Sequence, residues 1–361
     1  MSRAVRLILG AMLVAIVAEG AASTLLFVRD LANPVVDVNT RPARYDALLG
    51  WVGLPNFAMP DMFGVGAPLS TNADGMRVHR PVSAAVAPGV TRMICSGDSF
   101  THGWGVGDSD TFCAQLERVL PHLETLNMAQ HGFGIDQAWL WYRRDGGRYA
   151  HQLHLFAFIF NDFDRMGMRA FFGYPKPILR VEGDTLVVEN TPVPRSPPSA
   201  FPATLQRVLP TLRVTQLVGG LKQGDTARAS QRETEIQGVA EHVFSALEKL
   251  NAERGSQLVL VYLPTLSDLE PSKLDDRRAR IERFASAAGI PFIDLTPDIR
   301  ALPPDSSAWY FITPNLIKAR GAARHYTVAG NRWVAARLAE RLNAMPATRA
   351  RLMAQPAGVK R

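Results

Sequence analysis

Apolar and polar residues follow two patterns that alternate along most of the chain. Short, nearly continuous apolar runs are typical of strands buried on both faces of a sheet, and they occur at residues 91–95, 123–128, 153–160, 256–264 and 290–295. Apolar residues at helical spacing separate or follow these runs, at residues 109–121, 136–144, 232–255, 279–289 and 327–345. Strands that alternate with helices form a parallel sheet with helices on both faces. We therefore predict an α/β fold with a doubly wound, flavodoxin-like sheet of five parallel strands.

One segment breaks this alternation. Residues 178–190, ILRVEGDTLVVEN, contain two strand-like runs joined at Gly183 and Asp184, which predicts a β-hairpin. A proline-rich stretch follows, up to residue 202. We assign both to an insertion at about residues 165–230 that lies over the carboxyl edge of the sheet, as a lid or a wall for a substrate.

The N-terminus begins with an apolar segment. Residues 7–27 are interrupted only by Glu19 and follow Arg3 and Arg6, and roughly 20 such residues span a bilayer. The first half also resembles the core of a signal peptide, which would be cleaved. We predict a signal anchor over residues 1–28, with a cleaved signal peptide and a buried core helix as the alternatives. The expected protein crosses the cell membrane once and holds its main domain outside the cytoplasm, in the periplasm.

The rest of the chain divides by pattern and composition. Residues 29–90 are rich in Pro, Gly and Asn and have little periodicity, so we expect an irregular extension that lies over a core. Residues 91–345 contain the alternating pattern and form the main domain. Residues 346–361 are basic and are expected to form a flexible tail.

The charge of the chain is positive but spread. The formal net charge is +7 and the pI is about 9.7, which would suit an anionic neighbour such as a nucleic acid or a membrane surface. No nucleic-acid recognition motif accompanies this charge, and the densest run, residues 274–283, alternates in sign. We therefore expect no nucleic-acid partner, and a membrane contact only through the N-terminal helix.

Motifs for disulfides, metals and cofactors are incomplete. Cys95 and Cys113 are too few for a disulfide framework or a four-cysteine zinc site. We expect two buried free thiols, and a single bond is the alternative in an exported domain. His102 and the HQLH stretch at residues 151–154 lack a further clustered metal ligand. A dinucleotide fingerprint would need glycine where Asp108 stands, so we predict neither a metal nor another cofactor.

Polar residues stand where three of the predicted strands end. Ser99 follows the first strand behind Gly97, which permits a sharp turn, and Asn161 follows the third. The second strand runs into NMAQHGFGIDQ, where a glycine could offer a bare backbone N–H. Because the carboxyl ends of parallel strands meet at one edge, these groups surround one crevice, and the helix after Ser99 would direct its N-terminus at an oxyanion. With His325 as a candidate base, they predict an acyl-transfer site.

The stretches that contain these residues resemble, in order, the sequence blocks of the SGNH/GDSL hydrolases. GDSFTHG, residues 97–103, is similar to the first block, G-D-S-x-T-x-G, and NMAQHGFGIDQ, FNDFD and RHYTVAGNRWVA are similar to the later ones. The resemblance covers roughly residues 91–343, and TNADGMR with the hairpin is similar to membrane-anchored bacterial members. It implies Ser99 as the nucleophile and His325 as the base. It also implies an oxyanion hole made of the Ser99 N–H, the Gly132 N–H and the Asn161 amide.

Two positions depart from the family pattern. Ile159 stands where the third block usually has a glycine, which changes packing rather than donor chemistry. Ala322 stands where the family has the acid of its triad, three residues before His325. In a serine protease, disabling the acid costs on the order of 10⁴ in turnover. Three hypotheses follow: another group, such as Asp305 or a backbone carbonyl, orients His325; the site is a slow Ser–His pair; or the site has decayed and only binds an acyl or sugar ligand.

The function that these patterns indicate is that of an SGNH-type serine esterase or acyl hydrolase, or an O-acyltransferase. It would act through a Ser99 acyl-enzyme on a small-molecule or glycan ester, such as an O-acyl group of a surface glycan. The alternative is a non-catalytic carbohydrate- or lipid-binding module on the same fold. Hydrolysis and transfer share the acyl-enzyme, so the sequence leaves the acceptor open.

Overall fold

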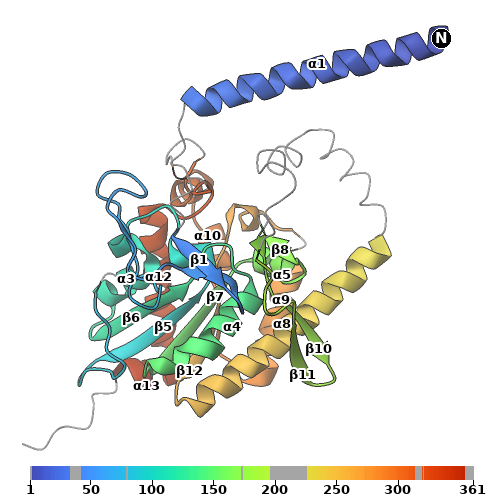
Figure 1. Ribbon diagram of the computed structural model, residues 1–361. Coiled ribbons are helices and arrows are strands. Elements are labelled where there is room, and N and C mark those ends of the chain that lie inside the picture. The colour runs from blue at the N-terminus through green and yellow to red at the C-terminus, as the bar shows by residue number, and fades with distance from the viewer. Residues whose placement is uncertain are drawn as a thin grey trace, which may run out of the picture. The chain divides into compact units, whose positions relative to one another are not determined.

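The computed structural model describes residues 2–32, 42–78, 80–171, 174–195, 226–272, 274–313, 319 and 321–353 (Figure 1). The chain forms two units, Met1–Thr40 with Pro197–Ser230, and Arg41–Ser196 with Gln231–Arg361. In the first unit, the helix α1 spans Arg3–Ala32, where a helix was expected. Among the residues described, no helix is both long and apolar enough to cross a membrane. The membrane anchor stays a prediction.

The second unit is built on a sheet of five parallel strands. These are β5 (Thr91–Gly97), β6 (Leu123–Ala129), β7 (Leu153–Phe158), β12 (Gln257–Tyr262) and β13 (Phe292–Asp294). They lie in the order β13-β12-β7-β5-β6, and every neighbouring pair is parallel. Counted along the chain, this is the order 2-1-3-4-5 of flavodoxin-like sheets, which confirms the predicted fold class.

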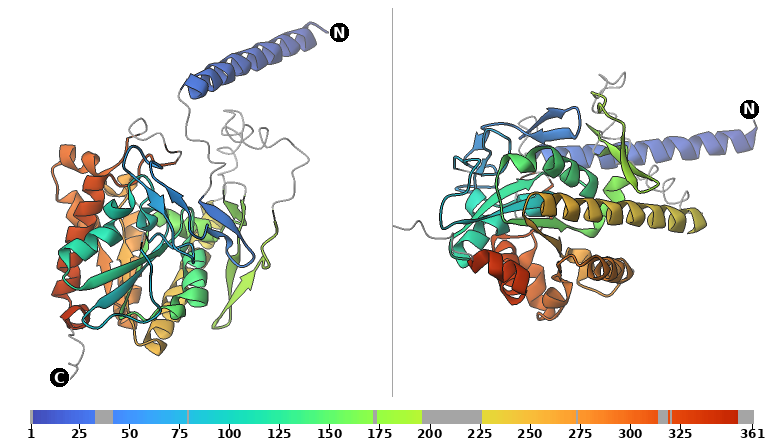
Figure 2. Two further views of the ribbon diagram at one scale, coloured as in Figure 1. Left: turned by 60° about the vertical axis from the view of Figure 1, so that its left-hand side comes forward. Right: turned by 90° about the horizontal axis from the view of Figure 1, so that it is seen from below.

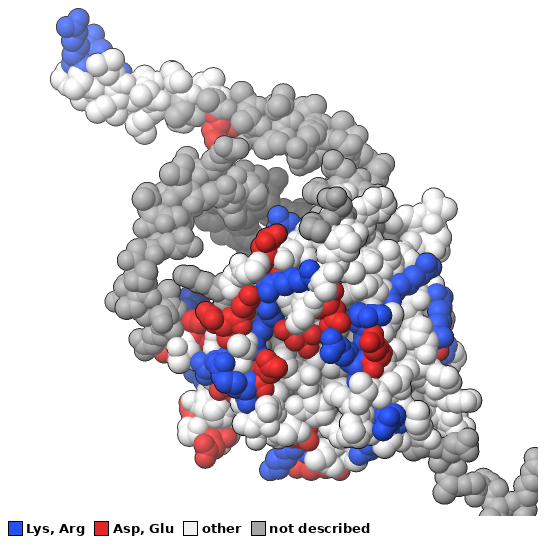
Figure 3. All heavy atoms as spheres, turned by 180° about the vertical axis from the view of Figure 1, so that it is seen from behind, with Lys and Arg blue, Asp and Glu red and all other residues white. Residues whose placement is uncertain are grey.

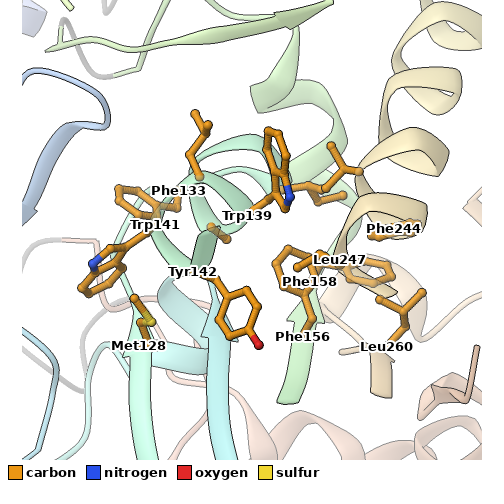
Figure 4. Packing of buried hydrophobic residues seen from close by; sticks show 14 of the residues in the cluster. Met128, Phe133, Trp139, Trp141, Tyr142, Phe156, Phe158, Phe244, Leu247 and Leu260 are labelled. Atoms are coloured by element: carbon orange, nitrogen blue, oxygen red, sulfur yellow. The ribbon is translucent and has the colours of Figure 1, made fainter. Parts of the chain in front are cut away.

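Helices cover both faces of this sheet (Figure 2). Because successive side chains of a strand point to opposite faces, alternate strand residues enter two separate cores. One core joins the sheet to α4 (Ile135–Asp145), α8 (Thr226–Glu253) and α9 (Leu274–Ala288). In it, Phe156 and Phe158 of β7 pack near Phe244 of α8 (Figure 4). The other core joins the sheet to α3 (Phe112–Val119), α10 (Thr296–Arg300) and α12 (Val328–Ala344).

The predicted and observed element boundaries differ by a few residues. The strand expected at residues 153–160 ends at Phe158, because α5 (Phe160–Met166) begins two residues later. The carboxylate of Asp162 accepts the Ile159 N–H over 3.0 Å and fixes that start. The helix expected to point its N-terminus at Ser99 is α2 (Ser99–His102), which has only four residues. Its dipole is correspondingly small, since few peptide units are aligned.

The extension before the sheet contains short strands rather than wholly irregular chain. β1 (Ala43–Asp46) pairs with β2 (Gly50–Gly53), and β3 (Ala58–Met59) pairs with β4 (Leu69–Ser70). A 3₁₀ turn, η1 (Asp108–Asp110), precedes α3.

The predicted hairpin is present in the insertion. β10 (Ile178–Glu182) pairs antiparallel with β11 (Thr185–Glu189), and Gly183 in the turn has φ 60°. A smaller pair, β8 (Ala170–Phe171) with β9 (Tyr174–Pro175), precedes it. Residues 196–225 of the insertion lie outside the described part, and the lid function stays a prediction.

Short helices complete the fold: η2 (Gly146–Arg148), η4 (Leu266–Asp268), α11 (Pro304–Ser307), η5 (Ala308–Tyr310) and α13 (Pro346–Met353). α13 occupies the first half of the segment expected to be a flexible tail. Pro346 suits the first position of a helix, and the Thr348 hydroxyl donates to the carbonyl oxygens of Leu342 and Met345. These contacts attach the segment to the end of α12.

Charged side chains of both signs intermingle on the face shown in Figure 3. The run at residues 274–283 lies in α9, where Arg277 pairs with Glu233 over 2.6 Å and Arg280 pairs with Glu241 over 2.7 Å, both across to α8. The alternating signs were expected to mark a solvated helix face, whereas two arginines of this run pair with acidic side chains of α8. The two cysteines are buried free thiols, the first of the two expected alternatives.

Candidate active site

The predicted site residues follow strands at the point where the winding of the sheet reverses. β5 lies between β6 and β7, and doubly wound sheets bind ligands beyond the carboxyl ends of the strands at such a switch point. Ser99 follows β5, Gly132 follows β6 and Asn161 follows β7. The topology therefore places all three at the edge where a ligand would bind.

The fold brings Ser99 and His325 together from distant parts of the chain. His325 Nε2 lies 2.8 Å from Ser99 Oγ. The Ile312 N–H donates to the His325 carbonyl oxygen over 2.7 Å, and the Phe100 ring lies 4.7 Å from the imidazole between centroids. The distance between Ser99 Oγ and His325 Nε2 is within the hydrogen-bond reach that a nucleophile and its base require.

The other ring nitrogen of His325, Nδ1, contacts a backbone carbonyl oxygen. Nδ1 lies 3.3 Å from the carbonyl oxygen of Ala322. Since a carbonyl oxygen can only accept, this contact assigns the proton to Nδ1 and leaves Nε2 to accept the Ser99 proton. A backbone carbonyl was one of the two groups expected to orient His325. The side chain of the other, Asp305, lies outside the described residues.

A carboxylate also lies beside the serine. Asp98 Oδ2 is 3.4 Å from Ser99 Oγ, while Asp98 Oδ1 accepts the Phe100 N–H over 2.8 Å and caps α2. Arg165, from α5, donates to Asp98 Oδ2 over 3.2 Å and also to Asp162 Oδ1. These three side chains form the Asp98–Arg165–Asp162 cluster, which the sequence did not reveal because it depends on the meeting of two strand ends.

Gly132 and Asn161 belong to segments that Arg165 connects. Arg165 Nη1 also donates to the Phe133 carbonyl oxygen over 2.8 Å, which ties the loop containing Gly132 to α5. Gly132 has φ 80°, and an added Cβ would lie 3.2 Å from the Phe171 ring, so a side chain is disfavoured there. Asn161 is half-buried in the first turn of α5. Within the described part of the chain, neither residue is hydrogen-bonded to Ser99.

Aromatic rings from separate segments gather around the loop after β6. Trp104 stacks on His131 with 4.3 Å between ring centroids, and His131 lies 6.4 Å from His325. Trp51, from β2, donates its Nε1–H to the His131 carbonyl oxygen over 3.0 Å. The N-terminal extension thus contributes to the surroundings of the site, a role that its irregular pattern did not indicate.

The extension also supplies Arg77, which holds the loop after the serine. Its Nε donates to Asp108 Oδ1 over 2.8 Å, and both groups are buried. Its Nη groups donate to the carbonyl oxygens of Pro68, His102, Gly103 and Val106. All five donors of the guanidinium are therefore used. The only sequence signal for this residue is its place in TNADGMR.

Burial and nearby charges act on the titration of the site. Burial lowers the pKa of His325 below its ordinary value, while the Asp98 charge and the Ala322 carbonyl act in the opposite direction. Burial raises the pKa of the Asp162 carboxyl well above its usual range, and the neighbouring Asp98 adds to this shift. A lowered pKa keeps His325 neutral near pH 7, the state in which it can accept a proton.

Comparison with solved structures finds likenesses at low sequence identity. A member of the lipolytic G-D-S-L family from Veillonella parvula is 13% identical, with 70% of this chain and 97% of that chain covered and a TM-score of 0.39. An acetyl xylan esterase is 14% identical, with 68% and 97% covered and a TM-score of 0.41. A lipase/acylhydrolase from Enterococcus faecalis is 11% identical, with 71% and 96% covered and a TM-score of 0.37. No family model and no curated protein sequence matches the chain. Likenesses this weak assign no function, which has to come from the site itself.

Proposed function

We propose that the chain is a serine esterase, in which Ser99 is the nucleophile and His325 the general base. The observation that carries this proposal is the 2.8 Å contact between Ser99 Oγ and His325 Nε2, in the tautomer that leaves Nε2 free to accept a proton. The pair stands at the switch point of a doubly wound sheet, which is where such folds bind ligands.

The chemistry proceeds in two halves. His325 Nε2 accepts the Ser99 proton while Oγ attacks the ester carbonyl carbon, and the carbonyl oxygen becomes an oxyanion. Collapse of this intermediate breaks the bond to the leaving oxygen, which takes the proton from Nε2 and departs as an alcohol. A water molecule then attacks the acyl-Ser99 with the same assistance, and the carboxylic acid leaves.

The proposed oxyanion donors are the N–H groups of Ser99 and Gly132 and the amide of Asn161. Their support is their common position at the carboxyl edge of the sheet. One such donor typically contributes roughly 10²–10³ in turnover.

Orientation of the base by a carbonyl has a cost in rate. The Ala322 oxygen fixes the tautomer of His325 but has only a partial negative charge, whereas a triad acid stabilises the imidazolium with a full one. We therefore infer an esterase in which His325 works without an acid at position 322.

We further propose an O-acyl ester as the substrate, with a surface glycan as the carrier of the acyl group. The sequence supports this through its apolar N-terminal segment and its resemblance to membrane-anchored bacterial members of the SGNH hydrolases. The acceptor is water in a hydrolase or a second hydroxyl in an acyltransferase. On this proposal the main domain lies outside the cytoplasm.

Turnover of simple esters tests the proposal. Hydrolysis of p-nitrophenyl acetate and butyrate is expected for the full-length chain, with loss of at least about 10²-fold in Ser99→Ala and in His325→Ala. A chain that hydrolyses neither ester, yet binds an acetylated oligosaccharide equally well before and after Ser99→Ala, would instead be a binding module.

A further inference from the structure

The proposed reaction puts a positive charge on His325 without an acid at position 322 to balance it. The imidazolium forms when the Ser99 proton moves to Nε2, and the acid of a triad normally stabilises it. Here Ala322 offers only a carbonyl oxygen, 3.3 Å from Nδ1. The stability of the cation therefore depends on other charges around the ring.

Several described side chains with titratable or charged groups face His325 from neighbouring segments: Asp98, His102, His131 and Arg165. Burial, with Arg77 nearby, puts the pKa of His102 well below its ordinary value, so this ring is neutral. Arg324, the sequence neighbour of His325, is exposed to solvent. Among these groups Asp98 supplies the negative charge.

Asp98 lies on the serine side of the imidazole. Its Oδ2 is 3.4 Å from Ser99 Oγ, which is itself 2.8 Å from His325 Nε2. The carboxylate oxygen is therefore no more than about 6 Å from the ring nitrogen, a distance at which an opposite charge favours the cation. The Asp98 side chain is 1% exposed, so solvent screens this interaction little.

Asp98 is also fixed in place from both sides. Oδ1 accepts the Phe100 N–H over 2.8 Å, and Oδ2 accepts from Arg165 over 3.2 Å. Because Arg165 engages the oxygen that faces Ser99, and because His325 Nε2 is nearer, the serine proton goes to the imidazole. The carboxylate acts through its charge and leaves the proton transfer to His325.

We propose that Asp98 is a positioning residue whose carboxylate stabilises protonated His325 from the serine side, in place of an acid at position 322. This inference rests on the proposed function. The cation then lies between the Asp98 carboxylate beyond Ser99 and the Ala322 carbonyl at Nδ1. Arg165 opposes the effect with its own positive charge but acts more weakly on His325 than Asp98 does.

Two substitutions should move the titration of His325 in opposite directions. Asp98→Asn keeps an oxygen that can accept from the Phe100 N–H but removes the negative charge, so the pKa of His325 falls by about one unit or more. Arg165→Gln removes the opposing positive charge, so the pKa rises. Loss of folding alone would not produce shifts of opposite sign.

The experiment has two readouts on the full-length protein. A ¹H–¹⁵N NMR titration follows the His325 ring, and the rate of Ser99 modification by an alkyl fluorophosphonate is measured from about pH 5 to pH 9. Asp98→Asn is expected to lower both midpoints and to slow modification at least about tenfold. Asp162→Asn is the matched control, since it removes the other carboxylate on Arg165, and it should produce a smaller shift.

The outcomes separate this inference from the proposed function. An unchanged His325 titration in Asp98→Asn, in a protein whose wild type is modified at Ser99, overturns the role of Asp98 alone. Equal shifts in Asp98→Asn and Asp162→Asn overturn it as well, because the effect would then be that of the cluster in general. A wild-type chain that is not modified at Ser99 overturns the proposed function. A fall of the His325 pKa in Arg165→Gln also contradicts the inference, because Arg165 is the cation that opposes Asp98.

Discussion

Among individual residues, Ala322 occupies a position whose surroundings suit an apolar side chain and not an acid. Its side chain is buried in an apolar cluster with Trp104 and Ile312, and only its carbonyl oxygen contacts His325. An acid at this position would place its carboxylate among apolar side chains. The surroundings of position 322 are therefore packed for a methyl group.

This packing predicts that Ala322→Asp destabilises the protein instead of completing a triad. Burial of a carboxylate without a full set of partners should lower the free energy of unfolding by roughly 2 kcal/mol or more. Urea unfolding checks this, with Ala322→Ser as the smaller control. Unchanged stability together with faster esterase turnover would show that the site has room for the acid.

The titration of His325 predicts the pH dependence of the reaction. Burial lowers its pKa below about 6.5, the ordinary value, and only the neutral ring can accept a proton. Ester turnover should therefore be constant at pH values above the lowered pKa of His325, and it should fall as the pH decreases through that pKa. A profile of kcat/KM against pH checks this, and a midpoint above neutral pH would contradict it.

Among the elements, the loop between α2 and α3 is bound by a side chain of the N-terminal extension. Arg77 of the extension binds Asp108 and four carbonyl oxygens around this loop, which directly follows the helix that begins with Ser99. A guanidinium offers five donors in a planar fork, whereas an ammonium offers three from one atom. The contact therefore requires arginine.

We expect Arg77→Lys to lower the free energy of unfolding by roughly 3 kcal/mol, because it leaves buried acceptors without donors. Arg80→Lys is the matched control, since Arg80 pairs with Glu117 near the surface, and its cost should be below about 1 kcal/mol. Denaturant unfolding of both variants gives the comparison. Equal losses would show that Arg77 is not the specific support of this loop.

The sequence predicted the strands and helices better than it predicted the hydrogen-bond partners of individual side chains. Strands buried on both faces are apolar at nearly every position, so β5, β6, β7, β12 and β13 were all found, and the Gly183–Asp184 turn identified the hairpin. The sequence did not indicate how short α2 is, because Gly97 indicates the turn before the helix and not the residue at which the helix ends. The partner of His325 Nδ1 was left open between a carboxylate and a carbonyl, since backbone acceptors carry no sequence signal.

Buried charges were the hardest features to predict. Arg77 and Arg165 have no distinguishing pattern around them in the sequence. Only the folded chain brings Arg77 to the Val106 carbonyl oxygen and Arg165 to the Asp98 carboxylate. Asp162 caps the start of α5 by accepting the Ile159 N–H. Its second contact is to Arg165.

At the level of the whole molecule, the site belongs to one of the two units. All of its described contacts lie within the unit formed by Arg41–Ser196 and Gln231–Arg361, which includes most of the extension. The extension is therefore part of the folded domain, although its sequence lacks periodicity. Residues Met1–Thr40 belong to the other unit.

This division predicts different results for two truncations. A chain that begins at Arg41 should fold and keep its esterase turnover within about twofold, because the unit that holds the site stays whole. A chain that begins at Thr91 loses Trp51 and Arg77 and should be unfolded or inactive. Circular dichroism and ester turnover of both chains check this. An active chain that begins at Thr91 would show that the extension is dispensable.

The most direct measurement is covalent modification of the full-length protein by an alkyl fluorophosphonate, followed by peptide mapping. A serine with its base at 2.8 Å should form one adduct, located on Ser99, which is absent in Ser99→Ala and slowed at least about 10²-fold in His325→Ala. No adduct, or an adduct that persists in Ser99→Ala, would contradict the assignment of Ser99 and His325 as nucleophile and base.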